Sequence, residues 1–286
     1  MTEIGIAGAG RVAQALGRLL RERGEPVASV ASRTPAHAAE AARFIGGIEV
    51  VTYEDLARRC PRVLIAVSDD ALVDVAGRLA HSGMRNGAVL HTCGARGVAA
   101  VEELARAGVA CGVLHPLQAV SSPQQGVAAL PGATFAISGE GEAAAWARQI
   151  VALLDGTPLH IQTGREALYH AAAVMASNYV VALIDASVEL LRAAGVPEDE
   201  ALRVIRPLVE TNARNALTLT PERALTGPIE RGDADTVALH LAAFRDAAPG
   251  TRELYCTLGL RVLDLARRRG LDKAYADRLE RCLRNG

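Results

Sequence analysis

Residues 3–13 read EIGIAGAGRVA, a short apolar run that leads at once into glycines with the spacing GxGxxA. A helical pattern follows and stops at Gly24. In this strand–turn–helix setting the first glycine makes a tight turn, the second lets backbone approach a pyrophosphate, and Ala13 permits close helix packing. The stretch therefore predicts a dinucleotide-binding domain. We expect five residues of the turn to form the cofactor site: Gly8, Gly10, Arg11, Val12 and Ala13.

The second apolar run, PVASVAS, ends about 20 residues after the glycines, where NAD-binding domains usually carry an acidic residue for the ribose hydroxyls. Here the chain has Ser32, Arg33 and Thr34 instead. Hydroxyls and a guanidinium can hold a 2'-phosphate that a carboxylate would repel, so the sequence predicts NADP(H) as cofactor. The alternative is that Arg33 is a solvated residue at a loop tip.

Further apolar runs occupy 62–67, 87–92, 108–116, 133–138 and 157–162, with helical patterns between them. Continuous hydrophobicity is typical of strands buried on both faces, so residues 1–162 are predicted to form a doubly wound α/β Rossmann domain. Ligands in such folds bind beyond the carboxyl ends of the strands. We therefore expect cofactor contacts from Val67, Ser68, Asp69, Thr92 and Gly94, and substrate contacts from His115 and Gln118. For His91, which also ends a strand, a supporting role in the loop is an equal alternative.

Strand patterns disappear after residue 162. Helical patterns cover 165–194, 197–217, 233–247, 250–269 and 271–284. The second domain, 163–286, is therefore predicted to be all-helical and to bind substrate over the cleft.

Polar residues interrupt the apolar pattern of the segment 165–194. At 100° per residue, His170, Ser177 and Asn178 fall on one side of a single helix. They are either a solvent-facing stripe or part of a cleft. The second interpretation is favoured because the residues between them include no charged side chain.

The segment 220–240 gathers Thr226, Arg231, Asp233 and His240. We interpret it as facing the substrate, although Asp233 or Asp235 also suits the cap of the following helix. The RGD tripeptide at 231–233 is not interpreted as an adhesion motif.

Composition sets limits on function. The chain has 286 residues, half of them hydrophobic, and a formal net charge of −1, which does not suit a nucleic-acid-binding protein. Its five cysteines lack the spacing of a zinc site or disulfide framework, so no metal is expected. Without a leader pattern or an uninterrupted run of 18 apolar residues, the protein is predicted to be cytoplasmic and not membrane-bound.

Four motifs resemble a known family over essentially the whole chain: HTCGA (91–95), LHPLQ (114–118), YHAAAVMASNYVVAL (169–183) and ALTGPIERGDADTVALHL (224–241). They are similar to Rossmann-like proteins with a DUF2520 C-terminal domain. The resemblance places the chain in the 6-phosphogluconate dehydrogenase-like superfamily, beside ketopantoate reductase, pyrroline-5-carboxylate reductase and 3-hydroxyisobutyrate dehydrogenase. Residues 171–191 carry more apolar surface around the helix than the rest of the helical domain can easily cover, which predicts a homodimer joined through the C-terminal domains, in keeping with the superfamily.

The resemblance also implies a reductase that acts on a small molecule. This chain departs from the residue pattern of the related dehydrogenases at one point. Several of these dehydrogenases place a lysine on the long helix and an asparagine four residues on, whereas this chain has His170, Val174 and, eight residues on, Asn178. A histidine can supply the same proton. We expect His170 to protonate the substrate, Asn178 and Thr226 to position it, and Arg231 to bind its carboxylate.

The best single substrate is a 2-oxo acid, ketopantoate. The alternatives are a cyclic imine or a non-catalytic NADP-binding module, and coenzyme F420 is a lesser alternative as the hydride partner.

Overall fold

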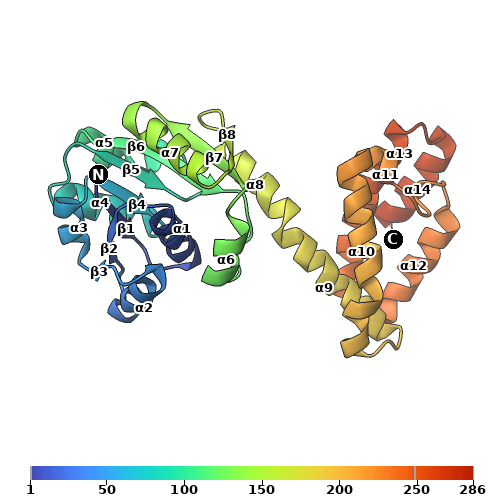
Figure 1. The fold of residues 1–286 in the computed structure, drawn as a ribbon. Coiled ribbons are helices and arrows are strands. Elements are labelled where there is room, and N and C mark those ends of the chain that lie inside the picture. The colour runs from blue at the N-terminus through green and yellow to red at the C-terminus, as the bar shows by residue number, and fades with distance from the viewer. Residues whose placement is uncertain (1, 248, 286) are drawn as a thin grey trace. The chain divides into compact units, whose positions relative to one another are not determined.

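The structure is a computed structural model that describes residues 2–247 and 249–285. Contacts between Cα atoms divide the chain into two compact units, residues 1–177 and 178–286. Figure 1 shows the helices and strands of each unit.

The first unit is built on one eight-stranded sheet with the order β3-β2-β1-β4-β5-β6-β7-β8. Neighbouring strands are parallel except for β6 and β7, which are antiparallel. The strands are β1 Ile4–Ala7, β2 Val27–Ala31, β3 Glu49–Val50, β4 Arg62–Ile65, β5 Ala88–His91, β6 Ala110–Pro116, β7 Thr134–Gly139 and β8 Thr157–His160.

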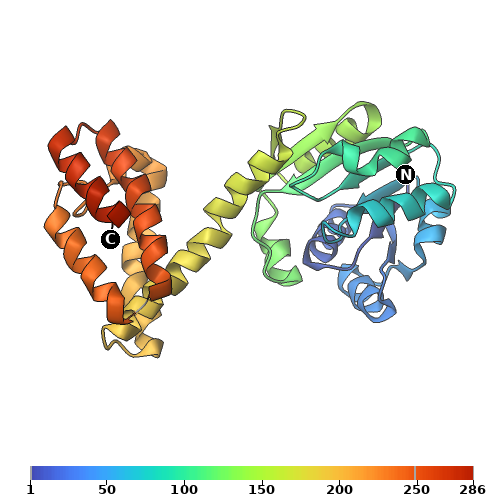
Figure 2. The ribbon, with the colours of Figure 1, turned by 180° about the vertical axis from the view of Figure 1, so that it is seen from behind.

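Helices cover both faces of this sheet, which gives three layers (Figures 1 and 2). One core joins the sheet to α1 (Arg11–Glu22), α2 (Pro35–Ile45) and α7 (Gly141–Leu153), with α6 (Pro123–Ala129) packed against α1. The other core joins it to α3 (Tyr53–Arg59), α4 (Leu72–His81), the 3-10 turn η1 (Val98–Val101) and α5 (Glu102–Arg106). The central strands are apolar on both sides because both sides are covered.

The predicted α/β class and Rossmann arrangement are confirmed, and a strand overlaps each apolar run that predicted one. The sequence did not predict β3, which is two exposed residues at the sheet edge. So short a strand has no hydrophobic period to detect.

The second unit is helical in the residues that the structure describes. Its helices are α9 Asn178–Ala193, α10 Glu198–Leu219, α11 Pro221–Ala224, α12 Ala234–Ala247, α13 Pro249–Arg268 and α14 Lys273–Asn285. Its core gathers Val237, Leu241 and Phe244 of α12 with Leu263 of α13 and Leu279 of α14.

The predicted continuous helix over 165–194 is wrong at one point. The structure has α8 (Glu166–Ala176), then Ser177 with φ −126° and ψ −76°, then α9. Ser177 donates its hydroxyl proton to the carbonyl of Ala173, a bond that often bends helices. The helical periodicity is therefore interrupted between His170 and Asn178.

One stretch in the described part of the chain, Glu166–Ala193, is long and apolar enough to cross a membrane by length and composition. Its mean hydropathy is 1.6, and none of the most apolar window is buried inside the chain. A single such stretch is weak evidence, and the absence of a membrane partner stays a prediction. The predicted domain boundary at 162/163 also stays a prediction, and contacts group α8 with the first unit.

Candidate cofactor cleft and active site

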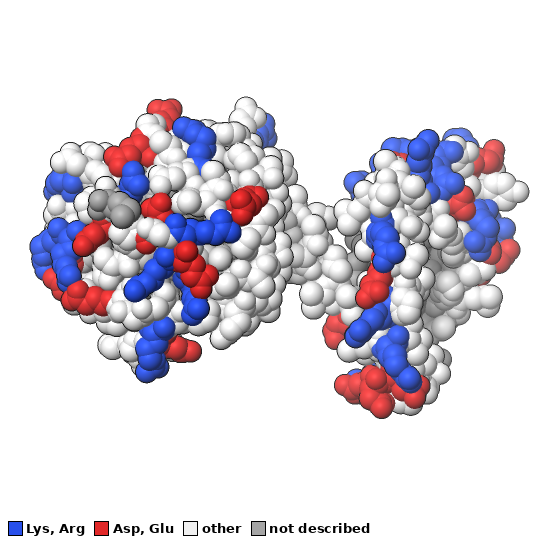
Figure 3. Space-filling model, viewed as in Figure 1, with Lys and Arg blue, Asp and Glu red and all other residues white. Residues whose placement is uncertain are grey.

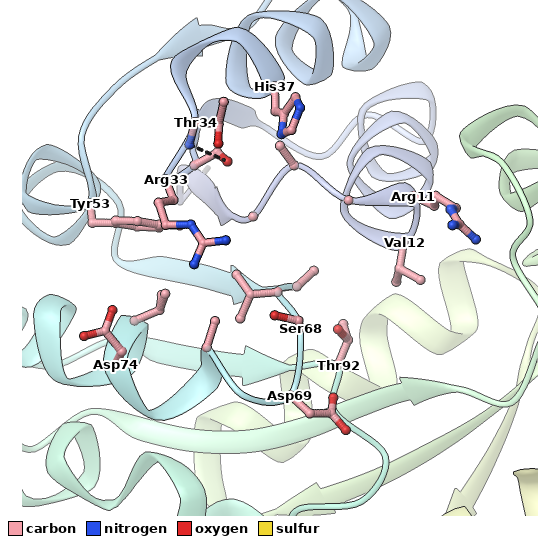
Figure 4. Close-up of a pocket in the computed structure, with 18 of the residues that line it drawn as sticks. Arg11, Val12, Arg33, Thr34, His37, Tyr53, Ser68, Asp69, Asp74 and Thr92 are labelled. Carbon is pink, nitrogen blue, oxygen red and sulfur yellow. Dashed lines mark hydrogen bonds between the residues drawn. The ribbon is translucent and has the colours of Figure 1, made fainter.

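A cleft of about 620 Å³ opens at the carboxyl edge of the sheet in the first unit (Figure 4). It is lined by the loop after β1, the loop after β2, the loop after β4, Thr92 after β5, and residues of α3 and α4. This is where ligands bind in open α/β sheets.

The two glycines of the first turn have different surroundings. Gly8 has φ +127°, and a Cβ there would lie 2.1 Å from the carbonyl oxygen of Ala66, so only glycine fits the fold. A Cβ at Gly10 would meet nothing within 4 Å, although Gly10 lines the cleft. Gly10 therefore leaves space on the cleft side that the protein itself does not fill, as close approach of a pyrophosphate requires.

The loop after β2 brings Ser32, Arg33 and Thr34 to one end of the cleft. The guanidinium of Arg33 points into the cleft beside Tyr53 (Figure 4). The buried Tyr53 holds this loop, since the backbone of Arg33 donates a hydrogen bond to its hydroxyl. His37 and Arg78 line the same end. This end therefore gathers the guanidinium groups of Arg33 and Arg78 and the hydroxyl groups of Ser32 and Thr34, which suit a phosphate, beside the carboxylate of Asp74.

At the ends of β4 and β5, Asp69 and Thr92 lie beside each other (Figure 4). Asp69 accepts a hydrogen bond from the thiol of Cys93, and burial chiefly raises the pKa of that thiol to about 11. Cys93 is thus a buried thiol rather than a reactive thiolate.

Most of the predicted cofactor residues lie in the lining of the cleft: Gly8, Gly10, Arg11, Val12, Ser32, Arg33, Thr34, Val67, Ser68, Asp69 and Thr92. Ala13 is instead fully buried in the core and packs α1, and Gly94 lies against His115. Arg11 turns its side chain toward the carbonyl of Val120, at 3.4 Å.

Next to the cleft, the structure brings His115 and His170 together. His115 stands at the end of β6, and its ring centroid lies 5.8 Å from that of His170 on α8. Nδ1 of His115 also lies 2.8 Å from the hydroxyl oxygen of Tyr169. These three side chains form a polar cluster within the first unit, which we call the His115 cluster.

Burial sets the protonation of the His115 cluster. It lowers the pKa of His115 to about 4, with a smaller contribution in the same direction from His170, while Asp69 acts against it. Burial also raises the pKa of Tyr169 to about 12. At neutral pH the His115 ring and the Tyr169 phenol are both uncharged. The cluster adjoins the cleft through the loop after β5, because Thr92 lines the cleft and Gly94, two residues further on, lies against the His115 ring.

The loop after β5 packs beneath the cluster. His91 is fully buried, its Nε2 lies 3.3 Å from the carbonyl oxygen of Gly97, and burial lowers its pKa to about 4. A Cβ at Gly97 would lie 2.5 Å from a carboxylate oxygen of Glu166. His91 therefore holds the loop against the start of α8, which agrees with a supporting role.

The remaining predicted substrate residues have local contacts. Gln118 is exposed after β6. In the second unit Asp233 caps α12, accepting bonds from the backbone N–H of Thr236 at 3.0 Å and from its hydroxyl at 2.6 Å. Nδ1 of His240 lies 2.8 Å from the hydroxyl of Tyr255. Thr226 and Arg231 are exposed in the same unit, and Asn178 begins α9. The substrate roles of all these residues stay predictions.

Sequence reasoning missed Tyr53, Tyr169 and Arg78. Tyr169 is 54 positions from His115, and Tyr53 lies 20 positions after Arg33. Both tyrosines read as ordinary residues in helical patterns. The sequence signal for Tyr169 was its place beside His170 at the start of the helix that follows the sheet domain.

The chain matches two family models. Residues 1–116 match a Rossmann-like domain, and residues 133–262 match a domain of unknown function, DUF2520. These two matches confirm the resemblance carried by the motifs and are consistent with the 6-phosphogluconate dehydrogenase-like superfamily.

Solved structures share this fold. A candidate NADP oxidoreductase from Bacteroides fragilis is 26% identical, with a TM-score of 0.76 over 93% of this chain and 98% of that one. A reductive aminase from Aspergillus terreus, in complex with NADPH and ethyl-5-oxohexanoate, is 17% identical, with a TM-score of 0.60 over 100% and 95%. Pyrroline carboxylate reductase from Plasmodium falciparum, with NADP bound, is 12% identical, with a TM-score of 0.58 over 98% of each chain. The comparison with curated protein sequences finds no match.

Proposed function

We propose that this DUF2520 protein is an NADP(H)-dependent reductase of a small carbonyl or imine compound. The observation that supports this most directly is the juxtaposition of the cleft with the His115 cluster, which the loop after β5 links through Thr92 and Gly94. A cofactor site and a group of proton-bearing side chains thus adjoin in one unit. Similar folds that contain NADP(H), and a relative classed as an NADP oxidoreductase, add support.

The residues of the cleft fit the cofactor. The open side of Gly10 suits the pyrophosphate at the start of α1, and Ser32, Arg33 and Thr34 suit the 2'-phosphate. Bound there, NADPH would supply a hydride. Asp69 and Thr92 would lie toward the nicotinamide end, because they line the part of the cleft that adjoins His115.

For the substrate we propose a small 2-oxo acid, with ketopantoate as the best single candidate. In this assignment His170 protonates the substrate oxygen and His115 binds the same end of the substrate. Asn178 and Thr226 would position the substrate, and Arg231 would bind its carboxylate bidentately. Gln118, Ser177, Asp233 and His240 complete the proposed substrate contacts.

Reduction of an imine is the second candidate. It is favoured by the negative charge of Asp69, which acts on His91, Cys93 and His115 alike and would attract a cationic iminium. The reductive aminase and the pyrroline carboxylate reductase of similar fold are consistent with it.

A panel of 2-oxo acids and cyclic imines, each followed by loss of NADPH absorbance, separates these candidates. We expect turnover of at least one 2-oxo acid. Turnover of imines alone would remove the 2-oxo acid assignment. NADPH binding without turnover on any member would leave a non-catalytic NADP-binding module.

We also propose that the protein is a homodimer joined through the helical unit. The observation that supports this is the exposed apolar surface of α9, where Tyr179 and Val181 are 56% and 67% exposed. The sequence from Ala171 to Ile184 contains no charged residue, and the part of it that faces the viewer in Figure 3 is white.

Light scattering at micromolar concentration tests this assembly. We expect twice the chain mass, and we expect Val181→Glu to shift the population toward the monomer, because a carboxylate would be buried against apolar surface. A monomer for the unaltered protein contradicts the proposal.

A further inference from the structure

The hydrogen bond between Tyr169 and His115 determines which nitrogen of the His115 ring carries its proton. Tyr169 Oη lies 2.8 Å from Nδ1, and the two rings meet edge-on at 87°. The imidazole lone pair is a better acceptor than the phenol oxygen, so Tyr169 donates and Nδ1 accepts. A neutral imidazole that accepts at Nδ1 carries its proton on Nε2.

The same ring packs against a glycine. A Cβ at Gly94 would lie 2.7 Å from Nε2 and 2.8 Å from Cδ2 and Cε1. Nearly equal distances to three adjacent ring atoms place this Cβ over the face of the ring, so any side chain at 94 would displace His115. Glycine at 94 therefore lets the His115 ring lie against the loop after β5.

His115 adjoins the cleft through the loop after β5, which contains Gly94. Gly94 follows Thr92, which lines the cleft, by two residues, and the charge of Asp69 acts on the His115 ring. Burial keeps the ring neutral at any pH well above about 4. His115 is thus a poor general acid at neutral pH but a fixed hydrogen-bond donor.

We propose that neutral His115 donates a hydrogen bond from Nε2–H to the reacting oxygen or nitrogen of the substrate, and that Tyr169 is the positioning residue that fixes this tautomer. The proposal rests on the reductase function. No proton leaves His115: its N–H polarises the double bond, as a preorganised donor does where negative charge develops. The proton itself comes from another group, to which the reductase proposal assigns His170.

This assignment narrows the substrate class. A carbonyl oxygen or the lone pair of a neutral imine accepts a hydrogen bond, whereas a protonated iminium has no lone pair to accept one. The reacting atom should therefore be an acceptor when it binds. Within the reductase proposal this favours carbonyl compounds and neutral imines, and it disfavours the cationic iminium that Asp69 would attract.

The tautomer is tested by nitrogen-15 NMR of the imidazole rings in the full chain without cofactor at neutral pH, with His115→Gln identifying the signals of His115. We expect a neutral ring protonated at Nε2. In Tyr169→Phe, which keeps the aromatic packing, we expect the proton to distribute between the two nitrogens. The control Tyr275→Phe, at an exposed tyrosine of α14, should leave His115 unchanged. A ring protonated at Nδ1, a cationic ring, or a tautomer that Tyr169→Phe does not change overturns the proposal.

Kinetics give the second readout. We expect His115→Ala to lower kcat by about 10²–10³-fold, as removal of an oxyanion donor does, and His115→Gln to recover part of the loss. Tyr169→Phe should lower kcat by about tenfold with NADPH affinity unchanged. Turnover that is unaffected by His115→Ala overturns the proposal and leaves the reductase standing. If His115 is protonated at Nε2 but the protein turns over no substrate, the reductase function is wrong. The substrate role of His115 is then wrong with it.

Discussion

Replacing His170 with alanine should lower turnover by about 10²–10⁴-fold and leave NADPH affinity unchanged. His170 lies on α8 beside His115, outside the lining of the cofactor cleft. Loss of a general acid affects the chemical step, while the groups that would hold the cofactor lie in other loops. Steady-state kinetics and a cofactor titration of the same preparation measure both quantities.

Two further variants test the role of His170. His170→Gln keeps a hydrogen bond but no transferable proton, so it should recover substrate affinity more than rate. His81→Ala removes a histidine of α4 whose side chain is 80% exposed, and it should leave both constants unchanged. If His170→Ala only lowers the unfolding temperature while kcat stays within a few-fold, His170 is a packing residue and another group protonates the substrate.

Arg33→Ala should weaken NADPH binding by roughly 1–3 kcal/mol and affect NADH much less, because a charge-assisted contact to the 2'-phosphate is lost. The guanidinium of Arg33 points into the cleft, and Tyr53 holds its backbone, so the side chain is placed for this contact (Figure 4). Fluorescence titration with each cofactor gives the two dissociation constants.

Arg58→Ala is the matched control for Arg33. Arg58 is a half-exposed arginine of α3 that pairs with Asp55 at 2.7 Å and does not line the cleft. Its removal should change neither constant. Equal losses of NADPH and NADH affinity in Arg33→Ala would show that Arg33 does not discriminate the phosphate.

The sequence predicted the sheet domain well because its signals are local. A few neighbouring residues are enough to recognise the turn at Gly8 and Gly10, and the same is true of the continuous apolar strands. The break at Ser177 was missed, because it shows in the backbone dihedrals and not in the apolar pattern. The prediction that Asp233 or Asp235 caps the following helix is confirmed for Asp233, since a cap depends on residues three apart.

The candidate site was harder to predict from the sequence because its contacts join residues that are far apart in the chain. His115 and His170 were each singled out, but nothing in the sequence pairs His115 with Tyr169 across 54 positions. The role of Gly94 is similar: its motif HTCGA suggests a cofactor loop, whereas the space that its missing side chain leaves is taken by the ring of His115. Such contacts are set by which strand ends meet at one edge of the sheet.

As a reductase, the protein should transfer a hydride from NADPH to a small substrate. The most direct measurement uses NADPH deuterated at the transferred position of the nicotinamide, incubated with the protein and the best substrate of the panel, with the product analysed by mass spectrometry. We predict a product that carries one deuterium on the carbon of the former double bond, and far less of it with His170→Ala. A product without deuterium, or none from any substrate while NADPH binds, would contradict the account.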